Sequence, residues 1–171
     1  MNQDIVDNSS LSLKQRIDLI KECLLRSDIG LKNFSEGENG FYRFDIAFGN
    51  ESYSLRILSK NIVNSGWSEK PYIKRIQVPS FLGKEIPLNT MQNSSMFLGI
   101  AFVNNEPIIA VWNPFSYVFH KTNRSCYVNV KSLVLGFHES FIKTIDSKQI
   151  ILVCDKNHFG DLVKYYHEDN R

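Results

Sequence analysis

Residues 55–77 read LRILSKNIVNSGWSEKPYIKRIQ, and the rest of the chain is best understood outward from them. The stretch begins as an alternating strand, passes through a polar loop, and alternates again from Tyr72 to Val78. Its five basic residues stand against a single acid, Glu69. A long basic loop that carries one Trp and lies between two strands is suited to hold a polyanion.

A second basic region lies at residues 113–131, which contain three Lys or Arg residues, one His and no acid. Together, residues 56–77 and 113–131 hold eight Lys or Arg residues against one acid, whereas the remainder holds twelve against seventeen. This separation of charge predicts one focused anion-binding face.

The composition indicates a single domain over residues 1–171, because this length buries a sizeable core and the 43% hydrophobic content is typical of soluble globular proteins. The N-terminus, MNQDIVDNSS, is too polar for a signal peptide, and the apolar runs are too short to cross a membrane. Three scattered Cys residues without CxxC spacing indicate free thiols. We therefore expect a cytoplasmic protein without membrane contact.

The first predicted element is a helix over residues 13–27. Ser12 and Gln15 have the spacing of a capping box. Apolar residues then recur at helical spacing, namely Leu13, Ile17, Ile20 and Leu24. Gly30 is expected to end the helix in a left-handed conformation. Residues 1–10 show no periodicity and are expected to be a flexible lead-in.

The later part of the chain is predicted to be rich in short strands. The expected strands cover residues 41–48, 52–58, 73–78, 96–103, 107–112, 125–130 and 149–155. Asn104-Asn105 suits a type I′ hairpin turn. Residues 131–145 fit either a strand edge or a short helix, and 159–167 fit a closing helix. The predicted fold class is mostly β with flanking helices (α+β), an antiparallel pseudobarrel of seven or eight strands over residues 41–166.

Catalytic motifs are not found in the sequence. It contains no GxGxxG, GxxxxGK[ST], GxSxG or HExxH. A metal-dependent nuclease needs Glu-x-Lys on a core strand, and Glu69-Lys70 and Lys84-Glu85 lack that spacing. We expect no catalytic residue, metal, cofactor or small-molecule substrate in this domain.

The first basic loop supplies candidate nucleic-acid contacts. Arg75 and Gln77 lie two apart on one strand and point to the same side, where Arg can pair with guanine and Gln with adenine. Alternatively, both are the polar outer face of a half-buried strand. Trp67 can stack on a base or tuck back onto its own barrel. The other candidates in this loop are Lys60, Asn61, Asn64, Ser65, Ser68, Glu69, Lys70 and Lys74.

The second basic loop mixes aromatic and polar residues over 113–125. Phe115, Val118 and Phe119 are expected to anchor it to the core. Its polar tip, which ends at Ser125, can reach base edges or phosphates. The candidates here are Asn113, Ser116, Tyr117, His120, Lys121, Thr122, Asn123 and Arg124.

Residues 41–166 resemble the B-three-type pseudobarrel DNA-recognition domains of restriction endonucleases. The resemblance is carried by SLRIL at 54–58, then Gly66, Glu69, Pro71-Tyr72 and RIQ at 75–77. It continues with FLG at 97–99, IIAVWNP at 108–114 and Ser125. The chain is most similar to the N-terminal specificity domain of LlaJI-type systems, which are McrB-like. It departs from that pattern in having one glycine in the arm and an added Ile73-Lys74 before the RIQ.

The resemblance implies that an N-arm at residues 59–71 and a C-arm at 113–124 grip the major groove from two sides. It implies site-specific double-stranded DNA binding by a non-catalytic targeting domain, linked to motor (GTPase) and nuclease parts. An alternative is a modified-cytosine reader that flips a base into a pocket lined by Trp67, Trp112 or Tyr117. Further alternatives are a small nuclease and a protein-binding barrel.

Overall fold

The computed structural model describes residues 3–37, 39–80, 95–117, 124–146 and 148–169. Its elements, in chain order, are β1 Val6–Asn8, α1 Leu13–Arg26, β2 Gly30–Glu36, β3 Tyr42–Phe48, β4 Glu51–Asn61, β5 Val63–Asn64, β6 Ile73–Val78, β7 Ser95–Val103, β8 Glu106–Trp112, η1 Pro114–Ser116, β9 Arg124–Asn129, α3 Val130–Glu139, β10 Phe141–Asp146, β11 Gln149–Asp155 and α4 Phe159–Asp169.

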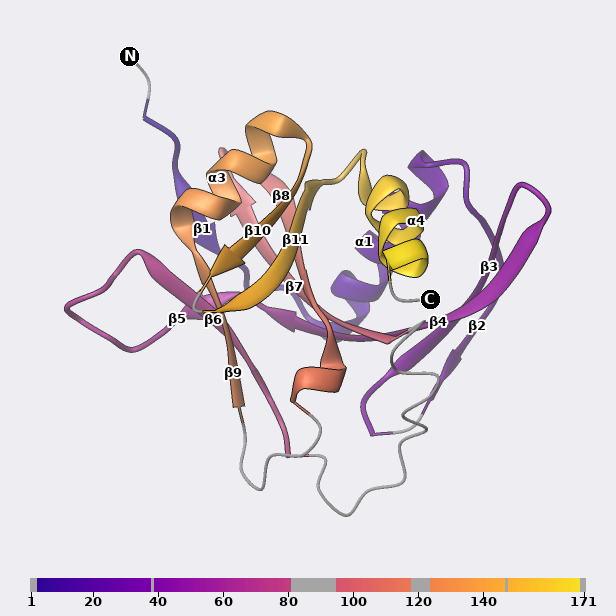
Figure 1. Cartoon of the computed structure of the whole chain (residues 1–171), viewed down its shortest axis with the longest axis horizontal. Helices are drawn as coiled ribbons and strands as arrows, with labels where there is room; N and C mark the ends of the chain where they lie inside the picture. Colours follow the sequence, from indigo (N-terminus) through magenta and orange to yellow (C-terminus); the bar gives the residue numbers. More distant parts are fainter. Residues whose placement is uncertain (1–2, 38, 81–94, 118–123, 147, 170–171) are drawn as a thin grey trace.

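The strands form two sheets (Figure 1). The larger is an eight-stranded mixed sheet in the order β10-β11-β8-β7-β4-β3-β2, with β1 added beside β7. The smaller has the order β5-β6-β9. The predicted mostly-β class with flanking helices is therefore confirmed. The antiparallel prediction is only partly right, and the described strands do not close into the expected pseudobarrel.

The departure from an antiparallel arrangement lies at one pair, β4 and β7, which are parallel in the register Arg56↔Ser95 to Asn61↔Ile100. The chain leaves β4 into the smaller sheet and later re-enters the larger one in the same direction. Every other pairing in both sheets is antiparallel. Such a crossover leaves no trace in the periodicity of the individual strands.

The N-terminal segment contains a short strand where a flexible lead-in was expected. Val6–Asn8 pairs with residues 101–103 of β7, just beyond the point where β4 ends its own pairing with β7. Ser9 Oγ donates to Asn61 Oδ1 at 2.6 Å, and Asn61 Nδ2 donates to the Leu11 carbonyl at 2.9 Å. These contacts fix the segment to the end of β4.

Helix α1 begins as predicted and ends earlier. Ser12 Oγ accepts from the Gln15 N–H at 3.2 Å, and Gln15 Oε1 accepts from the Ser12 N–H at 2.8 Å, which confirms the capping box. The left-handed residue after the helix is Asp28 (φ 56°), not Gly30. Gly30 instead starts β2, which pairs with β3 and was not predicted.

The backbone decides two predictions, the hairpin turn at Asn104-Asn105 and the ambiguous stretch at residues 131–145. Asn104 and Asn105 have φ of 51° and 66°, so the type I′ hairpin between β7 and β8 is confirmed. Residues 131–145 contain both a helix and a strand, which are α3 and β10. Asn129 caps the start of α3 by accepting from the Lys131 N–H at 2.8 Å. The predicted strands at 107–112 and 149–155 and the closing helix are confirmed.

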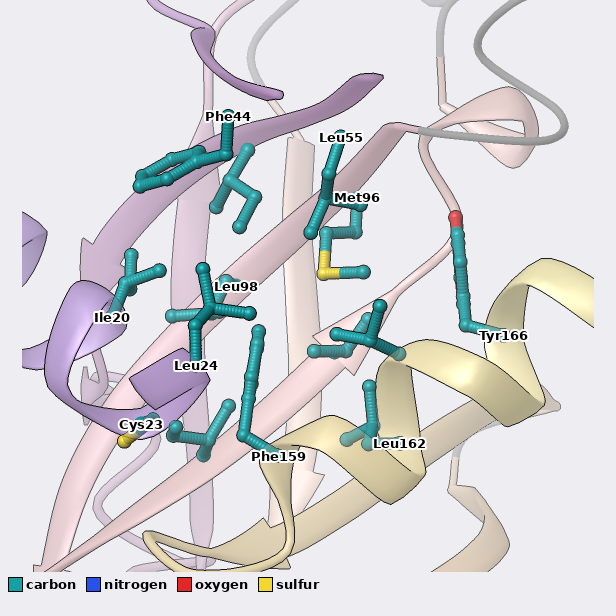
Figure 2. Close-up of a cluster of buried hydrophobic side chains, with 14 of the residues drawn as sticks. Ile20, Cys23, Leu24, Phe44, Leu55, Met96, Leu98, Phe159, Leu162 and Tyr166 are labelled. Atoms are coloured by element: carbon teal, nitrogen blue, oxygen red, sulfur yellow. The ribbon is translucent and has the colours of Figure 1, made fainter. Parts of the chain in front are cut away.

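The larger sheet separates two hydrophobic cores. Helices α1 and α4 cover one face, where Leu24 and Phe159 meet Met96 and Leu98 of β7 (Figure 2). On the other face, alternate β7 residues such as Phe97 pack against β6, β9 and α3. β7 is buried on both sides, and from Met96 to Val103 it contains only apolar residues and Gly99. No helix in the described ranges combines the length and apolar character needed to span a membrane.

The smaller sheet approaches the larger one closely at Gly99. A Cβ at this position would lie 2.7 Å from Ile62 Cγ1 and 2.8 Å from Ile76 Cγ2. Only glycine therefore fits without movement of the Ile62 and Ile76 side chains. This contact fixes the base of the N-arm against the core.

Candidate nucleic-acid interface

The smaller sheet has one buried face and one outward face. Along β6, Ile76 and Val78 are buried, and Cys126 and Val128 of β9 are buried beside them. The alternate residues point away from the core. By the pairing register they are Val63 of β5, Ile73, Arg75 and Gln77 of β6, and Ser125, Tyr127 and Asn129 of β9. We call these seven residues the outer face.

The N-arm loop is shorter than predicted, because the strands that precede it extend further along the chain than predicted. β4 continues to Asn61, and Val63–Asn64 pairs with Arg75 and Lys74. Residues 59–61, predicted to belong to the loop, are therefore strand, and the connecting loop covers residues 65–72. Gly66 has φ of 87°, a left-handed conformation that favours glycine. The loop extends away from the rest of the chain (Figure 1).

Trp67 lies on the outer face through a contact that the sequence did not reveal. Its ring stacks on Tyr127 with centroids 4.8 Å apart and planes at 22°. The Lys70 ammonium lies 5.6 Å from the indole centroid, and the Ser65 hydroxyl accepts from the Trp67 N–H at 3.2 Å. Trp67 remains 46% exposed. The indole is thus ordered by β9 yet still open to a ligand.

Arg75 and Gln77 share the outer face, as the strand period predicted. Arg75 Nη1 donates to Ser125 Oγ at 3.2 Å across the β6–β9 pair. The Nε atom is buried and has no hydrogen-bond partner among the described residues. Gln77 is exposed and lies directly opposite Ser125. The outer face therefore presents a cation and an amide side by side.

Three predicted contact residues are engaged at the base of the N-arm. The Lys74 ammonium donates to Asn64 Oδ1 at 2.6 Å and to Asn8 Oδ1 at 3.0 Å. Burial lowers the pKa of Lys74, and the Asp7 carboxylate opposes this shift. Asn61 binds residues 9 and 11, as described above. Lys74, Asn64 and Asn61 thus hold the hairpin to the N-terminal segment.

The other N-arm candidates are distributed around the loop. Ser68, Glu69 and Lys70 are exposed and, with Gly66 and Trp67, line an open hollow. Lys60 is half-buried near the end of β4. Ser65 is buried, and its hydroxyl is the acceptor for Trp67. Trp67 contacts the outer face through Tyr127, and Lys70 lies over the Trp67 ring.

Among the C-arm candidates that the structure describes, Asn113 and Tyr117 contribute to the fold. Asn113 caps η1 by accepting from the Phe115 N–H at 3.0 Å, and Ser116 ends that turn. Tyr117 is 3% exposed, and burial raises its pKa well above the ordinary value. Arg124 is exposed at the start of β9. His120, Lys121, Thr122 and Asn123, and the expected anchors Val118 and Phe119, lie outside the described residues.

The two arms leave the smaller sheet at opposite ends. The N-arm loop enters β6 at Ile73, which pairs with Asn129, whereas residue 124 enters β9 opposite Val78. Five strand steps separate these ends, or about 17 Å. The outer face therefore lies between the roots of the two arms.

The sequence reasoning missed Tyr127. The signal that could have found it is the alternation of the predicted strand at 125–130, because Cys126 and Val128 are apolar while Ser125 and Tyr127 fall on the other side. Trp112, considered above for a base pocket, is 1% exposed and donates from Nε1 to the Tyr127 carbonyl at 3.3 Å. Trp112 therefore supports β9 from inside.

The described residues have buried cysteines and dispersed potential metal ligands. They contain no group of three or more His, Cys, Asp or Glu side chains arranged to hold a metal ion. Cys23, Cys126 and Cys154 are free and buried. Burial raises the pKa of Cys23 and of Cys126 to about 12, so these thiols stay protonated at neutral pH.

Comparison with known sequences gives a family. The family described as methylase-associated X1 matches residues 53–163, which run from β4 into α4 and include both arms and the smaller sheet. No curated protein and no solved structure gives a significant match. The chain belongs to the methylase-associated X1 family, whose domains are of the target-recognition type in restriction-modification systems.

Proposed function

We propose that this chain binds double-stranded DNA site-specifically and targets a restriction-modification enzyme to its site. The observation that carries the proposal is the outer face, where Arg75, Gln77 and the Trp67–Tyr127 stack lie between the roots of two basic arms. Phosphate contacts from arm cations would supply most of the affinity, and base contacts would supply the sequence preference.

The catalytic steps would belong to other parts of the system. The described residues offer no metal cluster, and the sequence lacks nuclease and nucleotide-binding motifs. We propose that a methylase, or the GTPase motor and nuclease of a LlaJI-type, McrB-like enzyme, supplies those activities. The domain itself would need no cofactor.

The test is duplex binding measured by fluorescence anisotropy between about 50 and 200 mM salt, because each lost phosphate contact lowers the log–log salt slope by about 0.9. Lys70→Ala removes an exposed N-arm cation and is expected to weaken binding and reduce the slope. Lys32→Ala is the matched control, since Lys32 is an exposed cation on β2 that donates to Ser52 Oγ. The absence of duplex binding by the unmodified chain would refute the proposal.

The modified-cytosine alternative is less well supported. Two of its three candidate aromatic residues, Trp112 and Tyr117, are buried in the core that lies between the larger sheet and β6, β9 and α3. Trp67 alone remains accessible, and its stack with Tyr127 lies on an outward face. Titration with methylated and unmodified duplexes of equal sequence separates the two functions, because a reader would bind only the methylated duplex tightly.

A further inference from the structure

We propose, on the basis of the DNA-binding function above, that β6 reads a guanine and an adenine separated by one base pair. Arg75 would pair with the guanine and Gln77 with the adenine, both at their major-groove edges. Ser125 would act as a positioning residue that holds the Arg75 guanidinium. The proposal thus assigns a base preference to two residues and a supporting role to a third.

The Arg75 side chain is anchored on the outer face by one hydrogen bond and by burial of its Nε. Its Nε is buried, and Nη1 already donates one hydrogen to Ser125 Oγ at 3.2 Å. Val63 and Tyr127 are the residues directly opposite Arg75 on the two neighbouring strands. A guanidinium anchored through Nη1 loses less freedom on binding than an unanchored one, and its remaining terminal N–H donors match the paired acceptors O6 and N7 of guanine.

Gln77 supplies the second half of the proposed reading. It is exposed and follows Arg75 on the same face. Gln presents one donor and one acceptor, the complement of N7 and N6 of adenine. Ser125 lies beside both residues, since it is the register partner of Gln77 and the hydrogen-bond partner of Arg75.

The spacing along the strand fixes the spacing along the DNA. Two residues on one face of a strand are about 6.8 Å apart, and two base-pair steps of B-DNA also rise about 6.8 Å. The major groove admits a two-stranded β-ribbon, which β6 and β9 form here. Side chains at positions 75 and 77 would therefore meet bases with one pair between them.

The experiment selects bound duplexes from a pool with randomised central sequences and compares the enriched bases among variants. The unmodified chain is expected to enrich a guanine and an adenine at the stated spacing. Arg75→Lys, which keeps the charge and loses the fork, should lose the guanine preference by about 5- to 150-fold while keeping the adenine. Gln77→Ala should lose the adenine preference alone.

Ser125 is tested by two substitutions with the same readout. Ser125→Ala removes the acceptor and should weaken only the guanine preference, whereas Ser125→Thr keeps a hydroxyl and should retain it. Arg75→Gln is a second variant in case Arg75→Lys lowers the unfolding midpoint. An unchanged guanine preference in Ser125→Ala would overturn the role of Ser125.

Two failures are distinguishable. If the unmodified chain binds no duplex in the pool, the proposed function fails and this inference fails with it. If it binds duplexes but enriches no guanine–adenine pair at this spacing, or if Arg75→Lys and Gln77→Ala leave the preferences unchanged, the base assignment fails and the DNA-binding proposal stands.

Discussion

The two faces of the smaller sheet differ in what surrounds them, although they are built from alternate residues of the same strands. The inner face holds Ile76 and Val128, which are fully buried against the larger sheet. The outer face holds Arg75 and Gln77, which retain contact with solvent. One strand therefore secures the fold with every second residue and leaves the others for recognition.

Because the two faces share the same strands, the outer face and the core beneath it cannot move independently. The side chains of adjacent residues on β6 lie on opposite sides of a single backbone, and Gly99 lets the Ile76 side chain pack closely against β7. A shift of the inner residues would therefore displace the outer ones. Substitutions on the outer face should therefore change binding with little loss of stability, whereas substitutions on the inner face should change both.

The largest expected effect follows truncation of the inner face. Ile76→Ala removes a fully buried side chain and should lower the free energy of unfolding by about 2–5 kcal/mol, because it leaves a cavity between the sheets. Urea unfolding followed by circular dichroism measures the change. Gln77→Ala, one residue along, is the matched control and should change stability by less than about 0.5 kcal/mol. Equal losses in the two variants would contradict the assignment of the faces.

A smaller loss is expected where the sheets meet. Gly99→Ala places a methyl group within 2.7–2.8 Å of Ile62 and Ile76 and should destabilise the fold by about 1–3 kcal/mol through overpacking. Adding Ile62→Val to Gly99→Ala removes Ile62 Cδ1, which would lie 3.1 Å from the new methyl group, and should recover part of the loss. A double variant less stable than either single variant would show that the two side chains do not clash.

The aromatic stack on the outer face should contribute less. Trp67→Ala and Tyr127→Ala each remove the contact between rings whose centroids are 4.8 Å apart. A double-mutant cycle from urea unfolding should give a coupling of about 0.5–1.5 kcal/mol, typical of aromatic pairs. A coupling near zero would mean that the stack does not hold the N-arm loop to β9.

The smallest expected effect lies on the polar face of the larger sheet. Asp45 accepts from Ser54 Oγ at 2.5 Å and from Arg43 Nε at 2.8 Å, and these hydrogen bonds lower the pKa of its carboxyl from 3.8. A lowered folded-state pKa stabilises the fold above the unfolded-state value, and this stabilisation is lost as pH falls through the folded value. The stability difference between the unmodified chain and Asp45→Asn should therefore be constant near neutral pH and shrink below pH 3.8. A difference that grows in acid would contradict this assignment.

The predictable strands are those with strong local signals. β8 and β11 are short apolar runs bounded by turn residues, and their bounds follow from the sequence. β2 was missed because its sequence, GLKNFSE, is mostly polar and its pairing with β3 shifts register between Leu31 and Asn33. A bulge of this kind breaks the alternation on which strand prediction depends.

In the candidate site, too, some features follow from the local sequence and others do not. The shared face of Arg75 and Gln77 follows from the strand period alone. The stack of Trp67 on Tyr127 depends on the pairing of β6 with β9, which are far apart in sequence. The engagement of Lys74 by Asn8 depends on β1, which carries no local signal. Long-range strand pairing therefore determines which polar side chains face solvent and which form hydrogen bonds within the fold.

The position of β1 has a consequence for the behaviour of the protein in concentrated solution. Its three residues pair with the edge of β7 at positions 101–103, beside which β4 has already ended. Without β1, the backbone N–H and C=O groups along that edge would stand open next to an apolar strand. An open edge of this kind is a template for a strand from another molecule, and aggregation follows. Residues 6–8, a short strand of sequence VDN, thus cover the edge of β7 with which a strand from another molecule would otherwise pair.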